Sequence, residues 1–148
     1  MDKTFIRVRS IKDIVIFSSL AIVGITLTVL PIGDAAHIAG FLMIFAALIL
    51  AFVLKSAYKD IETNEQYLKM ERYFKQTMHA AIASAIASKP DSVDLSEENK
   101  GNAVKLDIYY SRSAGKAYVQ LFEYVPYTYQ PCTKMYEHEI SKVTKLIK

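Results

Sequence analysis

Several residue types are scarce or missing in this chain of 148 residues. Tryptophan is absent and cysteine occurs once, at Cys132, so no disulfide can form within the chain. A lone cysteine agrees with a reducing compartment such as the cytosol. The few glycines are scattered, and the chain has no phosphate-binding loop and no GxSxG, HExxH or CxxC motif. We therefore expect no enzymatic activity, no cofactor and no small-molecule substrate.

Histidine is also scarce, and its spacing does not suggest a metal site. The three histidines are His37, His79 and His138. His138 follows Cys132 by six residues, and two residues at that separation do not share one face of a helix. A structural zinc ion needs four ligands at closer spacing. The sequence therefore predicts no bound metal.

Charged residues are missing from two long stretches near the start of the chain. No charge lies between Asp13 and Asp34, and none lies between Ile38 and Leu54. A helix crosses the hydrocarbon of a bilayer with about 20 mainly apolar residues. We therefore predict a membrane α-helical hairpin of two transmembrane helices over residues 14–54.

The basic residues around these stretches predict an orientation. Four precede the first stretch (Lys3, Arg7, Arg9 and Lys12), Lys55 and Lys59 follow the second, and the connecting loop has none. Because basic residues favour the cytoplasmic side, both termini should be cytoplasmic in an inner (plasma) membrane. A net charge of +3 is too small to suggest nucleic acid as a partner.

Two alternatives compete with the membrane hairpin. Residues 1–35 have the basic start and apolar centre of a signal peptide, with Gly33 and Ala35 as small residues for cleavage. That apolar centre is longer than is usual for a signal peptide, and a second apolar stretch follows at once. The other alternative is a buried hairpin of a soluble protein, but the remaining chain is too short to cover two uncharged helices.

Small side chains recur in both stretches and predict where the helices pack. Small residues let helix backbones approach closely in a membrane. The predicted packing residues are Ala21, Gly24 and Thr28 in the first helix and Gly40, Ala47 and Ala51 in the second. Hydroxyl groups in such helices usually bond back to their own backbone, but in an oligomeric pore they would face water.

Beyond a flank at residues 1–13 and the hairpin, we predict a stalk helix over 55–90 and a small α+β cytoplasmic module over 91–148. Apolar residues recur at three- and four-residue steps up to Pro90, which favours the stalk helix. Two alternating segments around a turn near Gly115 predict a β-hairpin. An apolar stripe after Pro131 then predicts a C-terminal amphipathic helix.

Tyrosine is the unusual enrichment, since seven of the ten tyrosines lie between Tyr109 and Tyr136. Tyrosine is favoured at protein interfaces, where its ring gives a large contact area and its hydroxyl stays wet. Core packing accounts for some of these residues. For the others we predict a protein interface at Tyr124, Tyr127 and Tyr129.

Together these features favour a non-enzymatic inner-membrane adaptor or accessory subunit. Its expected partners are the lipid bilayer and either a second copy of the chain or a larger membrane protein. Self-association is expected because a small soluble part with few strands has little core and open sheet edges. The alternatives are an oligomeric pore-forming or membrane-perturbing effector and a membrane-anchored sensor of a small ligand. The layout is similar in outline to that of small bacterial two-span proteins, which is an analogy of layout alone.

Overall fold

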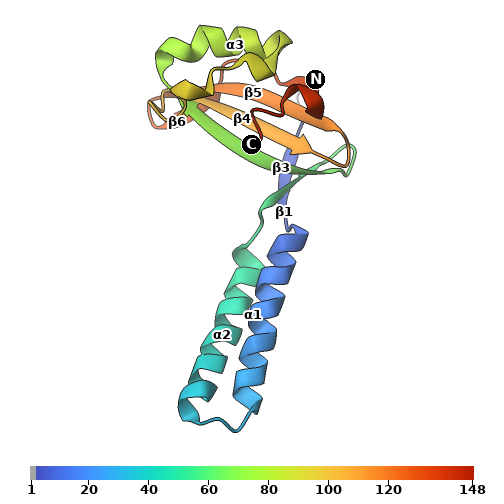
Figure 1. The fold of residues 1–148 in the computed structure, drawn as a ribbon, viewed down its shortest axis with the longest axis vertical. Coiled ribbons are helices and arrows are strands. Elements are labelled where there is room, and N and C mark those ends of the chain that lie inside the picture. The colour runs from blue at the N-terminus through green and yellow to red at the C-terminus, as the bar shows by residue number, and fades with distance from the viewer. Residues whose placement is uncertain (1–2) are drawn as a thin grey trace. The chain divides into compact units, whose positions relative to one another are not determined.

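The computed structural model describes residues 3–148 and divides into two compact units (Figure 1). One unit is Arg7–Ala57, which contains two long helices. The other unit combines the segment that ends at Ile6 with Tyr58–Lys148, and it contains most of a β-sheet. Each unit is described by itself below.

The helical unit consists of α1, Ile11–Val29, and α2, Asp34–Val53. Ser10 caps α1 with a capping box, in which its hydroxyl accepts from the Asp13 amide and the Asp13 carboxylate accepts from the Ser10 amide. The α2 helix follows Gly33, whose φ of +111° suits a residue without a side chain. Both helices are long and apolar enough to cross a membrane, so the prediction of two long apolar helices near the start of the chain is confirmed.

The sheet unit is built around a seven-stranded sheet in the order β1-β2-β3-β4-β5-β6, with β7 also paired to β5. The strands are β1 Phe5–Val8, β2 Ala57–Asp60, β3 Gln66–Phe74, β4 Val104–Ser111, β5 Lys116–Val125, β6 Thr128–Pro131 and β7 Tyr136–Glu139. The pairs formed by β3 to β7 are antiparallel. Because β1 precedes the helices and β2 follows them, both ends of the helical hairpin lead into neighbouring strands.

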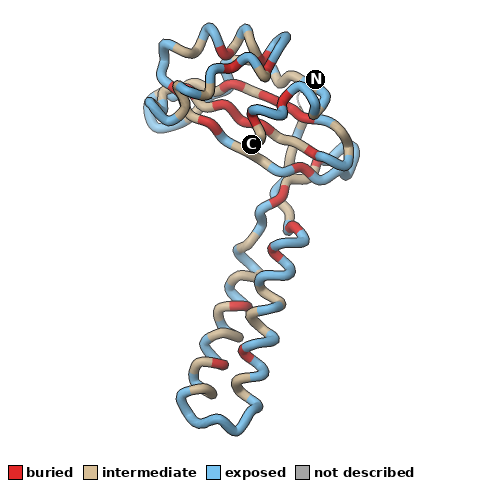
Figure 2. Tube along the Cα trace, viewed as in Figure 1, coloured by how far each residue is buried: buried red, intermediate tan, exposed pale blue. Residues whose placement is uncertain are grey.

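The core of this unit lies between the sheet and the helix α3, His79–Ser88 (Figures 1 and 2). Alternate residues of β4 and β5 face α3 and are fully buried, as the period of two along a strand requires. The C-terminal segment adds Val143 and Leu146 to the same core. Its buried members include Phe74, Ile82, Ile86, Val104, Leu106, Ile108, Val119 and Leu121.

The predicted β-hairpin is confirmed as β4 and β5. Val104 pairs with Glu123 at one end and Ser111 with Lys116 at the other. Gly115 has a φ of +68° in the turn, a conformation that glycine adopts without strain. Alternation together with a turn signal was therefore enough to identify this element from sequence.

The predicted stalk helix over 55–90 is wrong, because most of that segment forms β2 and β3 and only His79–Ser88 is α-helical. Apolar residues four apart, such as Met70 and Phe74, fit an alternating pattern equally well. Pairing of β3 with β4 decides between the two, since it places Met70 and Phe74 on the core face. Tertiary pairing thus overrides the local helical pattern.

The predicted C-terminal amphipathic helix is also wrong. Pro131 ends β6, and β7 and a 3-10 turn at Ile140–Lys142 follow it. β6 occupies the end of the strand order, where the missing amide of proline is tolerated. The apolar stripe did identify buried residues, since Val143 lies in the core, but these residues reach it without a helix.

Candidate functional site

The small residues predicted to pack the helices are all buried or half-buried in the helical unit. Gly24, Gly40 and Ala47 are buried, whereas the remaining three, Ala21, Thr28 and Ala51, are half-buried. A Cβ atom built on Gly40 would lie 2.6 Å from the Gly24 carbonyl oxygen and 2.5 Å from Thr28 Oγ1. The two backbones therefore touch at these glycines, as close helix packing in membranes requires.

The two threonine hydroxyl groups of α1 are engaged within their own helix. Thr26 Oγ1 donates to the Ile22 carbonyl and Thr28 Oγ1 donates to the Gly24 carbonyl, both at 2.8 Å. A hydroxyl that bonds to its own helix needs no water or partner helix. This arrangement gives no support to a water-filled path along α1.

The outward surface of the helical unit is apolar. Only 11% of the apolar window of each helix is buried. The exposed side chains include Ile22, Ile25, Phe41, Leu42, Phe45, Leu48 and Phe52. Soluble proteins rarely expose a continuous apolar surface of this extent, and the two helices are consistent with a membrane protein.

A buried carboxylate links the two ends of the helical hairpin. Asp13, which is 2% exposed, accepts hydrogen bonds from the Ser56 amide at 2.8 Å and from the Ser56 hydroxyl at 2.7 Å. The Ser10 and Ser56 hydroxyls are 2.8 Å apart. We call Ser10, Asp13 and Ser56 the hairpin knot. Its Ser10–Asp13 half has the spacing of a capping box, whereas no sequence signal points to Ser56.

The face of the sheet opposite the core carries charged residues that neutralise one another. Lys69 Nζ lies 2.8 Å from an Asp107 oxygen and 2.5 Å from a Glu71 oxygen, and Lys105 Nζ lies 3.2 Å from Asp107. Burial disfavours the charge on Lys69, but the hydrogen bonds to Asp107 and Glu71 outweigh it and raise the pKa of Lys69. The same contact to Lys69, aided by Tyr73, lowers the pKa of Glu71.

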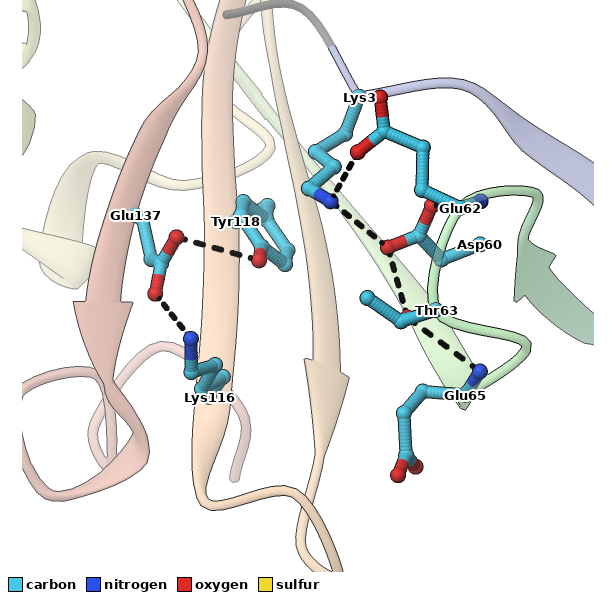
Figure 3. A network of polar contacts seen from close by, with 8 residues as sticks. All are labelled: Lys3, Asp60, Glu62, Thr63, Glu65, Lys116, Tyr118 and Glu137. Carbon is cyan, nitrogen blue, oxygen red and sulfur yellow. Dashed lines mark hydrogen bonds and ion pairs between the residues drawn. The ribbon is translucent and has the colours of Figure 1, made fainter.

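Aromatic rings cover one end of that face. The Phe5 ring stacks on Tyr109, with centroids 4.2 Å apart, meets Tyr67 edge-on and lies tilted against Tyr118. Figure 3 shows the polar contacts of one of these residues: the Tyr118 hydroxyl donates to Glu137, and Glu137 pairs with Lys116. The ring contacts of Phe5 fix the segment before α1 onto the sheet.

A second polar group holds the same segment. Lys3 Nζ lies 3.1 Å from an Asp60 carboxylate oxygen and 2.5 Å from a Glu62 oxygen (Figure 3). Burial opposes the ionisation of Asp60, yet hydrogen bonds from the Glu62 amide, the Thr63 hydroxyl and Lys3 lower its pKa. The folded structure therefore stabilises the ionised form of Asp60.

The predicted interface tyrosines lie around the turn between β5 and β6. Tyr124 is 51% exposed and Tyr127 is 96% exposed, while Tyr129 is half-buried. The Tyr129 ring packs edge-on against Tyr124 and Tyr73, and its hydroxyl donates to the Asn102 carbonyl at 2.6 Å. The structure thus gathers Tyr124 and Tyr129, whereas Tyr127 extends alone from the turn with a φ of +70°.

We call Tyr73, Tyr124, Tyr127 and Tyr129 the tyrosine patch. Tyr73 was not among the predicted interface residues, because its segment was predicted to form a stalk helix. The Tyr73 hydroxyl donates to Glu71, and this hydrogen bond raises the pKa of Tyr73 to about 12. The Tyr73 ring is therefore uncharged at physiological pH and presents a neutral phenol beside the patch.

The single cysteine lies next to a histidine but is not activated. His79 Nε2 is 3.3 Å from Cys132 Sγ, which in turn donates to the Leu121 carbonyl. Burial, with the nearby charge of Glu123, raises the pKa of the Cys132 thiol. A nucleophilic cysteine needs the opposite shift, so this pair lacks the chemistry of a catalytic dyad.

The other histidines make backbone contacts. His138 Nε2 is 2.6 Å from the Ile86 carbonyl and His37 Nε2 is 3.0 Å from the Leu30 carbonyl. Across residues 3–148, no group of three or more His, Cys, Asp or Glu side chains is placed to hold a metal ion.

Comparison with known proteins adds no functional assignment, since no family model, no curated protein and no solved structure matches the chain.

Proposed function

We propose that the chain is an integral membrane protein in which α1 and α2 cross the bilayer as a hairpin. The observation that carries this proposal is the exposed apolar surface of both helices. Burying apolar surface is worth about 25 cal/mol per Å², so lipid is a far better solvent for these side chains than water. Helices also satisfy their backbone hydrogen bonds internally, which hydrocarbon demands.

Two further observations favour an anchor over its alternatives. A buried hairpin of a soluble protein would be covered, yet most of each apolar window is exposed. A cleaved signal would remove β1 from the sheet together with the Phe5 ring that stacks on Tyr109. Retention of both helices keeps the sheet complete.

Both termini lie in the cytoplasm in this proposal. The basic residues at the open end of the hairpin support it, as does the absence of basic residues between α1 and α2. The pairing of β1 with β2 agrees, because it brings both chain segments that leave the hairpin to one sheet. The membrane is a bacterial-type inner membrane or plasma membrane.

The sheet unit acts as a non-enzymatic docking module of an adaptor or accessory subunit. The exposed rings of Tyr124 and Tyr127 support this role, since aromatic side chains on a rigid scaffold are common anchors of protein interfaces. The partner is a second copy of the chain or a larger membrane protein. Contact through the tyrosine patch would also cover the end of the sheet at β6.

Labelling of Cys132 in cells tests the topology without any added cysteine. Cys132 is exposed and is the single cysteine, so a membrane-impermeant maleimide reports its side of the membrane. We expect labelling only after the membrane is permeabilised, with the protein retained in the carbonate-washed membrane pellet. Cys132→Ser gives the background signal. Labelling in intact cells, or recovery of the protein in the supernatant, would contradict the proposal.

The docking role is tested by light scattering in detergent, which gives the mass of the protein complex. Tyr124→Ser combined with Tyr127→Ser should lower that mass, because both rings are exposed and neither is buried in the core. Leu68→Ser is the matched control, as Leu68 is an exposed apolar residue on β3. An unchanged mass in the double variant, or a monomeric wild type without co-purified protein, would contradict docking through these tyrosines.

A further inference from the structure

Three exposed basic residues each directly precede a residue of the hairpin knot in the sequence. Arg9 precedes Ser10, Lys12 precedes Asp13, and Lys55 precedes Ser56. The knot joins these segments through direct hydrogen bonds, although Asp13 and Ser56 are 43 residues apart in the chain. We call Arg9, Lys12 and Lys55 the basic cluster, and all three belong to the helical unit.

The basic cluster is not neutralised from within. Asp13 is the acidic residue nearest to it in sequence, but its carboxylate is buried and accepts three hydrogen bonds from Ser10 and Ser56. Among residues 3–148, no carboxylate forms an ion pair with Arg9, Lys12 or Lys55. The Asp13 carboxylate is thus engaged within the knot, and the three basic side chains remain exposed.

The position of the cluster along the helices indicates which anion it meets. α1 begins at Ile11 and α2 ends at Val53, so the three cations lie at the boundary between apolar helix and polar chain. In a bilayer this boundary is the level of the lipid phosphates. Arginine binds a phosphate through two parallel hydrogen bonds, and lysine binds it as a point charge.

We infer that the basic cluster binds the headgroup of an anionic phospholipid, with the hairpin knot as its scaffold. This inference rests on the proposed membrane anchor and names a lipid class as its partner. Each basic residue close to an anionic membrane surface strengthens binding about fivefold, so three residues give a preference of up to about 100-fold.

Native mass spectrometry of the full chain in detergent tests the inference, with phosphatidylglycerol and phosphatidylcholine as probes. Wild type should retain phosphatidylglycerol in preference to phosphatidylcholine, and an excess of inorganic phosphate should not displace it. The triple variant Arg9→Gln, Lys12→Gln, Lys55→Gln should lose most of that preference. Lys89→Gln, Lys142→Gln, Lys148→Gln is the control, because it removes three exposed lysines of the sheet unit and should keep the preference.

Several outcomes would overturn the inference. They are equal retention of both lipids by wild type, an unchanged preference in the triple variant, displacement by inorganic phosphate, and an equal loss in the control. Carbonate extraction of the same variants separates this failure from failure of the anchor. If the triple variant stays in the membrane while wild type shows no lipid preference, the anchor stands and the lipid site does not. If wild type itself is extracted, the anchor fails.

Discussion

The helical unit exposes its large apolar side chains, whereas the sheet unit buries them. Leu42 on α2 is 64% exposed, whereas Leu106 on β4 is 0% exposed. The contact inside the helical unit is made by Gly24 and Gly40, while the contact inside the sheet unit is made by large aliphatic and aromatic residues. This reversal is expected when one unit has lipid and the other has water as its solvent.

Both units nevertheless bury a carboxylate in the same way. Asp13 in the helical unit accepts from Ser10 and Ser56, and Asp60 in the sheet unit accepts from Glu62, Thr63 and Lys3. A buried carboxylate is tolerated only when hydrogen bonds or counter-charges compensate for lost water. The two units therefore differ in where their apolar side chains lie, but both compensate a buried carboxylate with hydrogen bonds.

The largest expected effect is that of Leu106→Ala in the sheet core. Removing a fully buried leucine costs lost apolar burial and leaves a cavity, so we expect a loss of about 2–5 kcal/mol in the free energy of unfolding. Urea unfolding in detergent, followed by tyrosine fluorescence, measures it. All ten tyrosines lie between residues 58 and 136, so the signal reports on the sheet unit alone.

Leu42→Ala is the matched change on the surface of the helical unit. It should leave the free energy of unfolding within about 0.5 kcal/mol of wild type, because Leu42 contributes to no core. It should instead weaken insertion into the membrane. If both Leu42→Ala and Leu106→Ala lowered the free energy of unfolding by several kcal/mol, Leu42 would be covered within the folded chain. The contrast between the two units would then be wrong.

Gly40→Val should have the next largest effect and should act on the helical unit alone. The added atoms would meet the Gly24 carbonyl and Thr28 Oγ1, so the helices must separate at a cost of about 3 kcal/mol. Energy transfer between dyes at positions 11 and 53, in a Cys132→Ser background, measures their separation during titration with dodecyl sulfate. Ala35→Val, at an exposed position in the first turn of α2, is the control. Equal resistance of both variants would refute contact between the two glycine backbones.

The sequence predicted the helical hairpin and β4–β5 because each depends on a local pattern. Uncharged apolar stretches identify the two long apolar helices, and alternation around Gly115 identifies a β-hairpin. The segment of β3 has no such unique pattern, since Met70 and Phe74 satisfy helical and extended spacing alike. Its pairing with β4, which is distant in sequence, decides the outcome. Long-range pairing of this kind is not encoded in local periodicity.

The candidate sites were only partly accessible to the same reasoning. The composition singled out Tyr124, Tyr127 and Tyr129, and their role in an interface stays a prediction. Tyr73 joined them only through the register of β3 beside β4. The hydrogen bond between Asp13 and Ser56 requires that the start of α1 and the end of α2 lie next to each other. The separate sequence patterns of the two helices do not predict this proximity.

Acid should destabilise the sheet unit through Asp60. Its folded-state pKa lies below the ordinary 3.8, so its contribution to stability is complete above that pH and is lost as the pH falls through the folded value. Asp60→Asn should therefore lower the free energy of unfolding by about 1–2 kcal/mol at neutral pH. The difference from wild type should shrink as the pH drops below about 4.

Urea midpoints measured by tyrosine fluorescence across that pH range check the prediction. Asp34→Asn is the control, because Asp34 is exposed at the start of α2 and no tyrosine lies in the helical unit. A difference between wild type and Asp60→Asn that stays constant with pH would mean that the ionised carboxylate contributes nothing.

The smallest effect separates two tyrosines of the tyrosine patch. Tyr129→Ser removes edge contacts with Tyr73 and Tyr124 and the hydrogen bond to the Asn102 carbonyl, which should cost about 1 kcal/mol in the free energy of unfolding. Tyr127→Ser removes a ring that is almost fully exposed and should cost nothing measurable. If urea unfolding shows the reverse order, Tyr127 is covered in the folded protein. The helical unit exposes a far larger apolar surface, which we assign to lipid. If Tyr127→Ser leaves the free energy of unfolding unchanged but weakens binding of a partner, the exposed Tyr127 ring belongs instead to a surface for a protein partner.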